Sequence, residues 1–241
     1  MIGRDRCVAI VPARSGSKRV PHKNKLLFAG QPLISWTIKA AKSTEEIDRV
    51  VVSTDDREIK AISEKNGASV PFLRPKDLAS DNASAIDVLQ HAISELASQG
   101  EFYEVAIYLQ PTSPLRDQSH ISAAIDLFNR RHAKSVVSVS EVPYPDEFTG
   151  ELAEDFSMKD FWIRRKTADR SQLLKKRFFL NGAIFVVRLK EALEQRSFLF
   201  EDKSYALVME GTASIDIDTW EHFRLAESIK RAAEDDLYSL T

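Results

Sequence analysis

Short runs of consecutive apolar residues recur along the chain, and each has the length of a buried strand rather than of a membrane span. Polar or turn-forming residues bound each run, as they usually do at the ends of strands. Runs without polar alternation are typical of strands that are covered on both faces of a sheet. Strands are therefore predicted at 7–13, 48–54, 104–110, 135–140 and 182–188.

The segments between these runs have the spacing of amphipathic helices. Asp55 stands three residues before Glu58, which predicts a capping box, and Gly67 is the expected end of that helix. Asp117 is the expected cap of a later helix, and Gly100 ends another. Helices are predicted at 32–43, 55–67, 84–100, 118–132 and from Thr219 to about Asp235.

This alternation of strands and helices predicts an α/β fold, with a mostly parallel sheet flanked by helices on both faces. The alternation of strand-like and helix-like segments stops near Glu141. Residues 141–180 are richer in proline, charged and aromatic residues, and their apolar positions show no clear period. Strand character then resumes, and the segments 205–210 and 213–218 lead to the last helix. We interpret 1–241 as a single domain that carries an inserted arm at 141–180.

Composition narrows the class of protein further. The chain has 241 residues, of which 43% are hydrophobic, and a net charge of −2 from 34 basic and 36 acidic residues. This balance predicts neither a nucleic-acid nor a membrane partner. Cys7 is the one cysteine and lies in an apolar run, which excludes a disulfide framework. No apolar targeting segment precedes it, so a cytoplasmic location is expected.

A charged loop, "VPARSGSKRVPHKN", follows the first predicted strand. Ligands of open α/β sheets bind beyond the carboxyl ends of the strands, where backbone N–H groups and basic side chains can hold phosphates. The loop matches neither the GxGxxG pattern of dinucleotide-binding proteins nor the GxxxxGK[ST] pattern of P-loop proteins. On composition alone, a solvated charged loop is an equally good interpretation.

The order of the motifs favours the phosphate-binding interpretation. The first loop, followed by "VVSTDD", "FLRPKDLASDNASAIDVLQHAI", "LQPTSPLR", "LNGAIFV" and "SIDID", resembles the acylneuraminate cytidylyltransferase family over about residues 7–230. The resemblance implies a Rossmann-like cytidylyltransferase domain with a small dimerisation arm, and hence a homodimer. It implies transfer of CMP from CTP to the anomeric hydroxyl of a nine-carbon 2-keto sugar acid, with release of pyrophosphate.

The resemblance also assigns nucleotide-binding residues. Arg14, Lys18 and three neighbouring residues match the triphosphate-binding positions, and Arg14 and Lys18 would neutralise charge that develops toward pyrophosphate. Arg74 matches an arginine that holds cytidine. The family often has a hydroxyl residue where this chain has Ala85, and the adjacent Ser84 would either contact the base or cap the next helix. The expected nucleotide-binding residues are Arg14, Ser17, Lys18, Lys23, Asn24, Arg74 and Ser84.

For the sugar acid, the resemblance points to Gln110 at the end of a strand and to Arg170 and Gln172 in the arm. The arm departs from the family pattern: Leu174 replaces a usual proline, and "EVPYPDEF" stands in place of a lysine-bearing segment. The acceptor is therefore less well defined than CTP. N-acetylneuraminate is the first expectation, and legionaminic acid, pseudaminic acid and the eight-carbon acid of lipopolysaccharide are alternatives.

Asp216 and Asp218 are the expected ligands of Mg²⁺. Residues i and i+2 of a strand point to the same face, so both carboxylates can meet one ion together with substrate phosphate oxygens. The alternative for Asp218 is a helix cap, because Glu221 follows three residues later. A non-catalytic nucleotide-binding module on the same fold remains a further alternative, whereas a dinucleotide-dependent oxidoreductase is disfavoured by the missing GxGxxG.

Overall fold

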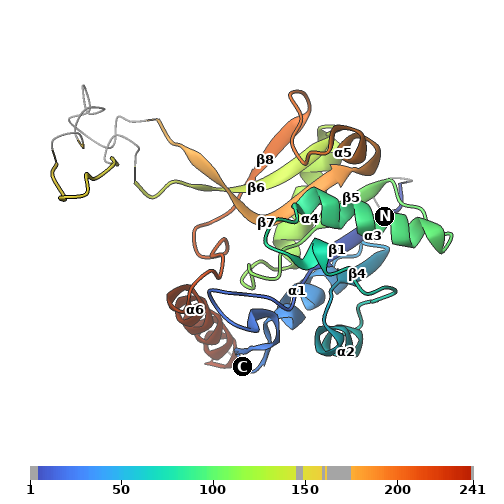
Figure 1. The fold of residues 1–241 in the computed structure, drawn as a ribbon, viewed down its shortest axis with the longest axis horizontal. Coiled ribbons are helices and arrows are strands. Elements are labelled where there is room, and N and C mark those ends of the chain that lie inside the picture. The colour runs from blue at the N-terminus through green and yellow to red at the C-terminus, as the bar shows by residue number, and fades with distance from the viewer. Residues whose placement is uncertain (1–4, 145–148, 159–160, 162–174, 240–241) are drawn as a thin grey trace.

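The computed structural model describes residues 5–144, 149–158, 161 and 175–239, built around one six-stranded sheet (Figure 1). All strand pairs are parallel except those made by β7, which runs antiparallel to both its neighbours. The predicted mostly parallel α/β sheet is therefore confirmed. In sheet order the strands are β4 (Arg49–Ser53), β1 (Cys7–Pro12), β5 (Val105–Tyr108), β7 (Phe178–Arg188), β6 (Ser135–Glu141) and β8 (Ser204–Val208).

Helices cover both faces of this sheet. Cys7, Ala9 and Val11 of β1 face one layer with α1 and α4, whereas Val8 and Ile10 face the other with α3 and α5. Both faces of β1 are fully buried, which explains its unbroken apolar run. The helices are α1 (Leu33–Lys42), α2 (Arg57–Lys65), α3 (Ala85–Ser98), α4 (Gln118–Arg130), α5 (Leu189–Gln195) and α6 (Trp220–Ser239).

Short elements connect the sheet to its helices. Two 3-10 turns, η1 (Lys23–Lys25) and η2 (Asp77–Ala79), follow the first loop and the Arg74 segment. A small hairpin of β2 (Leu27–Phe28) and β3 (Gln31–Pro32) leads into α1. No helix of the described residues is both long and apolar enough to cross a membrane.

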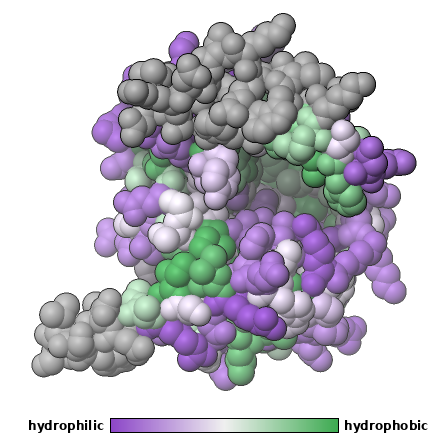
Figure 2. Space-filling model, turned by 90° about the vertical axis from the view of Figure 1, so that its left-hand side faces the viewer, coloured by the Kyte–Doolittle hydropathy of each residue, from purple (hydrophilic) through white to green (hydrophobic). Residues whose placement is uncertain are grey.

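The ends of β6 and β7 form a ribbon that projects from the body of the molecule (Figure 1). Val139 to Glu141 pair with Phe178 to Leu180, so the last three residues of the predicted arm belong to β7. Residues 145–148, 159–160 and 162–174 of the arm, with Arg170 and Gln172, lie outside the described residues. Figure 2 shows the face from which the ribbon projects, which is mostly hydrophilic and hollowed near its centre.

Capping interactions match the predictions at some helices and differ at others. Asp117 caps α4 in a capping box with His120, as expected. The predicted capping box of Asp55 is wrong, because the side chain of Asp56 accepts from the backbone N–H groups of Glu58 and Ile59 instead. At α6 the hydroxyl of Thr219 accepts from the N–H of His222, which leaves Asp218 free of a capping role.

Candidate active site

A cavity of about 470 Å³ opens at the carboxyl ends of β1 and β5, whose last residues Pro12 and Tyr108 both line it. This is the edge of an α/β sheet at which ligands bind. Nine of the expected site residues meet there, although they come from four separate segments of the chain. They are Arg14, Ser17, Lys18, Lys23, Asn24, Arg74, Gln110, Asp216 and Asp218.

Two hydrogen bonds from Ser15 fix the start of the first loop. Its backbone N–H and its hydroxyl donate to the two carboxylate oxygens of Asp55, at 2.9 and 2.6 Å. The amide of Asn24 closes the loop by donating to the carbonyl of Arg14 at 3.2 Å. Asp55 therefore anchors this loop to the end of β4 instead of capping α2, which explains why two aspartates stand in succession.

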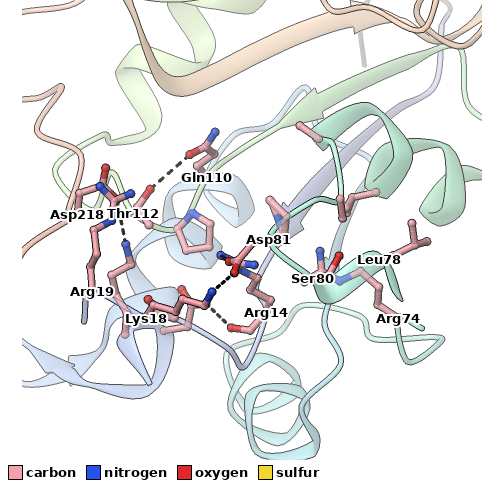
Figure 3. Close-up of a pocket in the computed structure, with 18 of the residues that line it drawn as sticks. Arg14, Lys18, Arg19, Arg74, Leu78, Ser80, Asp81, Gln110, Thr112 and Asp218 are labelled. Carbon is pink, nitrogen blue, oxygen red and sulfur yellow. Dashed lines mark hydrogen bonds and ion pairs between the residues drawn. The ribbon is translucent and has the colours of Figure 1, made fainter. Parts of the chain in front are cut away.

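Arg14 and Lys18 converge on one carboxylate, that of Asp81, in the centre of the cavity (Figure 3). Arg14 Nη2 lies 2.7 Å from Asp81 Oδ1, and Lys18 Nζ lies 2.5 Å from Oδ2. The hydrogen bond from Lys18, followed by that from Arg14, lowers the pKa of Asp81. A carboxylate held by an arginine and a lysine marks an anion-binding position, which sequence reasoning did not assign to Asp81.

Lys23 is the buried cation of the site, with 8% of its surface exposed. Its ammonium donates to the carbonyl of Ile217 and lies 3.7 Å from Asp218 Oδ1. Burial lowers the pKa of Lys23, and the nearby carboxylates of Asp216 and Asp218 oppose that shift. Arg19 pairs with the same oxygen of Asp218 at 2.9 Å, so two cations flank this carboxylate.

Asp216 and Asp218 both line the cavity, although the segment around them is not the strand that we expected. One backbone hydrogen bond, from Ile217 N–H to the carbonyl of Thr112, holds the segment against the loop after β5. Ile215 and Ile217 pack into an apolar cluster beneath α6. Alternation of apolar and acidic residues therefore places both carboxylates on the cavity side without a ladder of strand pairing.

The carboxylate of Asp216 suits a divalent cation. Its Oδ1 is buried and has no hydrogen-bond partner among the described residues. Burial raises the pKa of Asp216, and the Thr112 hydroxyl opposes that shift. No group of three or more His, Cys, Asp or Glu side chains in the described part of the chain could hold a metal ion. Two carboxylates and the phosphate oxygens of a nucleotide form the kind of oxygen donor set that Mg²⁺ prefers.

Arg74 is the second buried cation of the site, with 5% of its surface exposed. Its backbone N–H donates to the carbonyl of Thr54, which fixes the residue beside the end of β4. The side-chain Nε and Nη2 are buried without hydrogen-bond partners in the described structure, and burial lowers the pKa of the guanidinium. Unpaired donors of this kind are costly, so they indicate a ligand that supplies acceptors.

Ser84 is the expected nucleotide-binding residue that does not line the cavity. Its hydroxyl donates to the Asp87 carboxylate at 2.5 Å and accepts from the Asp87 N–H at 3.2 Å, so it caps α3. Ala85 lines the cavity in its place. Sequence reasoning also missed Tyr108, because a tyrosine inside an apolar strand resembles an ordinary core residue.

Gln110 follows β5 and points into the cavity near Thr112 (Figure 3). Its backbone carbonyl accepts a 3.3 Å hydrogen bond from Arg116, a fully buried residue that also donates to the carbonyl of Ala183 and the hydroxyl of Thr37. Burial lowers the pKa of Arg116 to about 9. Through these hydrogen bonds, Arg116 connects the loop after β5 to β7 and to α1.

Gly182 provides the space for the Gln110 side chain. It has φ +76, and an added Cβ would lie 3.3 Å from both Gln110 Nε2 and Oε1. A bulge in the β6–β7 pairing creates this conformation, and the Ser138 hydroxyl stabilises it by donating to Asn181 and accepting from the Ile184 N–H.

If Gln110 contacts the sugar acid, as the sequence motifs imply, Gly182→Ala is expected to raise the KM of that acceptor about tenfold while the affinity for CTP stays within twofold, because a small displacement of Gln110 disturbs only one side of the site. Steady-state kinetics with each substrate varied in turn measures this. Gly100→Ala is the matched control, because Gly100 has φ +80 and no neighbour within 4 Å of the added Cβ. Equal KM changes in the two variants would contradict the assignment of Gln110.

Comparisons with known proteins agree with this geometry. The family model described as cytidylyltransferase matches residues 8–196. The N-acylneuraminate cytidylyltransferase of Escherichia coli is 36% identical over 98% of this chain and 55% of its own length, so the chain spans about half of that relative. The CMP-N,N'-diacetyllegionaminic acid synthase of Legionella pneumophila and a pseudaminic acid cytidylyltransferase of Campylobacter jejuni are each 34% identical, over 96% of this chain and 99% of their own.

Among solved structures, CMP:2-keto-3-deoxy-manno-octonic acid synthetase complexed with CTP is similar with a TM-score of 0.69. The match covers 95% of this chain and 99% of the other at 16% identity, and it supports the fold. The family model and the relatives confirm the resemblance drawn from the sequence motifs: the chain belongs to the cytidylyltransferase family.

Proposed function

We propose that the protein transfers CMP from CTP to the anomeric hydroxyl of a nonulosonic acid, which gives CMP-N-acetylneuraminate or a close analogue and releases pyrophosphate. The relatives named for N-acylneuraminate, legionaminic acid and pseudaminic acid support this reaction class. The observation that carries the proposal is the cavity itself. It brings the cations of the first loop and the paired carboxylates of a distant segment to one sheet edge.

The order of groups along the cavity supports one orientation of CTP. Arg74 and Asp218 lie on opposite sides in the view of Figure 3, with Asp81 between them. The base would lie at Arg74, whose two free donors match the adjacent acceptors O2 and N3 of cytosine. The triphosphate would take the place of the Asp81 carboxylate on Arg14 and Lys18, and Ser17, Lys23 and Asn24 would complete its contacts.

Asp216 and Asp218 would hold Mg²⁺ on the side of the cavity opposite Arg74. When bound, the ion supplies positive charge to phosphate oxygens and to the attacking hydroxyl. The unpartnered oxygen of Asp216 and the cavity-facing position of both carboxylates support this assignment. The pairing of Asp218 with Arg19 and Lys23 keeps that carboxylate in place before the nucleotide arrives.

In the chemical step, the anomeric oxygen of the acceptor forms a bond to the α-phosphorus of CTP. The bond from that phosphorus to the bridging oxygen breaks, pyrophosphate leaves with the electron pair, and the hydroxyl proton passes to water. Arg14 and Lys18 would stabilise the charge that accumulates on the leaving group, and Lys23 would stay close to the reacting phosphate. The residues contribute positioning and fixed charge, and none needs to form a covalent intermediate.

The acceptor would bind on the side of Gln110. Arg170 and Gln172, in the arm, are proposed to reach the acceptor or a second subunit, with the arm at 141–180 forming the contact of a homodimer. The exposed apolar residues Phe178, Phe179 and Leu180, which form one strand of the ribbon, support such a contact. A cytoplasmic location is part of the same proposal, because CTP is a cytoplasmic substrate.

Pyrophosphate release tests the function and names the acceptor. The protein is incubated with CTP, Mg²⁺ and, in separate reactions, N-acetylneuraminate, legionaminate, pseudaminate or the eight-carbon acid. We expect rapid release with one nine-carbon acid. Binding of CTP without turnover on any acceptor would contradict the enzyme proposal and favour a nucleotide-binding module.

A further inference from the structure

Tyr108 ends β5 with its ring in the core and its residue on the wall of the cavity. The ring packs against Phe198 at 5.3 Å and Phe185 at 6.5 Å between centroids, within the apolar cluster beneath α3 and α5. These contacts fix the ring. A tyrosine used only for packing has no need to place its polar end at a ligand cavity.

Tyr108 is 3% exposed, and its hydroxyl makes no hydrogen bond to another described residue yet is not among the fully buried polar atoms, so this oxygen is accessible at the cavity wall. Buried tyrosine hydroxyls usually have a partner. The Arg74 guanidinium has two unpaired donors of its own, and its charge opposes the rise in the pKa of the Tyr108 phenol that burial causes. Both residues line the same cavity, so both can offer a polar group to one ligand.

Part of the cavity wall is apolar. Leu78, Ala83, Ala85 and Val88 line it, and none of these side chains can make a hydrogen bond. A flat pyrimidine fits between such side chains, with its polar edge turned to the few groups that can pair with it. The polar side chains of the cavity include those of Arg74, Tyr108 and Ser80, and the Ser80 hydroxyl, which lies near Arg74 in Figure 3, already donates to the carbonyl of Asp77.

Cytosine presents two neighbouring acceptors, O2 and N3, and one donor, the amino group at C4. If Arg74 donates to both acceptors, the amino group still needs an acceptor. A neutral phenol has two lone pairs and can supply one. Burial raises the pKa of Tyr108, so the hydroxyl keeps its proton at neutral pH and remains an uncharged partner.

We propose that the Tyr108 hydroxyl accepts a hydrogen bond from the 4-amino group of the cytosine base and so helps to select CTP. The inference rests on the proposed function, because it assumes that the base of CTP lies at Arg74. It adds a specificity-determining residue on β5, in the same cavity that Ala85 lines without a hydroxyl.

Tyr108→Phe removes the hydroxyl and keeps the ring packing. Calorimetric titration compares CTP with the analogue that has hydrogen in place of the 4-amino group, a pyrimidin-2-one ribonucleoside triphosphate, and with 2'-deoxy-CTP. We expect the variant to bind CTP and 2'-deoxy-CTP about five- to tenfold more weakly than wild type does, the usual effect of one neutral hydrogen bond. Its affinity for the 4-deamino analogue should equal that of wild type.

Tyr103→Phe is the matched control, because the Tyr103 hydroxyl donates to Glu101 at 2.9 Å and does not line the cavity. It should leave all three affinities unchanged. Unchanged CTP binding in Tyr108→Phe, or an equal loss for CTP and the 4-deamino analogue, would overturn the inference. An effect that disappears with 2'-deoxy-CTP would overturn it in favour of a ribose contact. Wild-type protein that fails to bind CTP would refute the proposed function instead.

Discussion

Asp216→Asn is expected to lower kcat about 10³-fold, because it removes one of the two carboxylates that would hold Mg²⁺ at the reacting phosphates. The geometry gives a second expectation. Burial raises the pKa of Asp216 and leaves its Oδ1 without a partner, so the charged carboxylate costs folding free energy at neutral pH. A neutral amide avoids that cost, and the midpoint of thermal unfolding should not fall below that of wild type.

Two measurements check this prediction: steady-state pyrophosphate release at saturating CTP and acceptor, and thermal unfolding without ligands. Asp202→Asn is the control, because Asp202 pairs with Lys134 at 2.5 Å and does not line the cavity. A kcat for Asp216→Asn within tenfold of wild type would contradict the assignment of this carboxylate. A low kcat together with a large loss of stability would point to a structural role.

Arg74→Met is expected to weaken CTP binding about 100-fold, which corresponds to about 3 kcal/mol. Both unpaired donors of Arg74 are lost, and methionine fills much of the same volume. The free protein should become more stable by about 1 kcal/mol or more, because a buried cation with unsatisfied donors is removed. A lower affinity for CTP together with a higher stability of the free protein is expected of a side chain whose role is to bind the ligand.

Arg74→Lys should recover little of the affinity, because an ammonium cannot donate side by side to two neighbouring acceptors. Titration calorimetry with CTP gives the affinities, and urea unfolding gives the free energies. Arg188→Met serves as a control: Arg188 is partly buried and pairs with Asp5 at 3.0 Å, away from the cavity. If Arg74→Met kept wild-type affinity for CTP, the base would have to bind elsewhere.

The sheet was predictable because buried strands require apolar runs, and the middle of β4 and most of β1 and β5 consist of such runs. The antiparallel direction of β7 could not be predicted, because the period of apolar residues is the same in a parallel and an antiparallel strand. Helix caps were predictable where one polar residue precedes the helix, as Asp117 does. Where Asp55 and Asp56 stand together, only the tertiary position of Ser15 decides which aspartate caps and which anchors the loop.

The residues of the candidate site were also predictable only in part. Motif order led to the residues of the first loop, to Arg74 and to the two aspartates before α6, and the structure brings these together at one sheet edge. The residues that interact with them could not be predicted from the sequence, because their roles depend on distances between segments that the fold brings together. Asp81 acquires its role by pairing with Arg14 and Lys18, and the role that we propose for Tyr108 depends on its sharing a cavity with Arg74.

The central claim is transfer of a cytidylyl group to a sugar acid, and tracing the phosphorus of CTP tests it most directly. CTP labelled at the α-phosphorus and CTP labelled at the γ-phosphorus are each incubated with the enzyme, Mg²⁺ and the accepted nine-carbon acid. The account predicts that the α-label appears in the CMP-sugar and the γ-label in pyrophosphate, in equal amounts. Release of the γ-label as inorganic phosphate, with no α-label on the sugar, would contradict it.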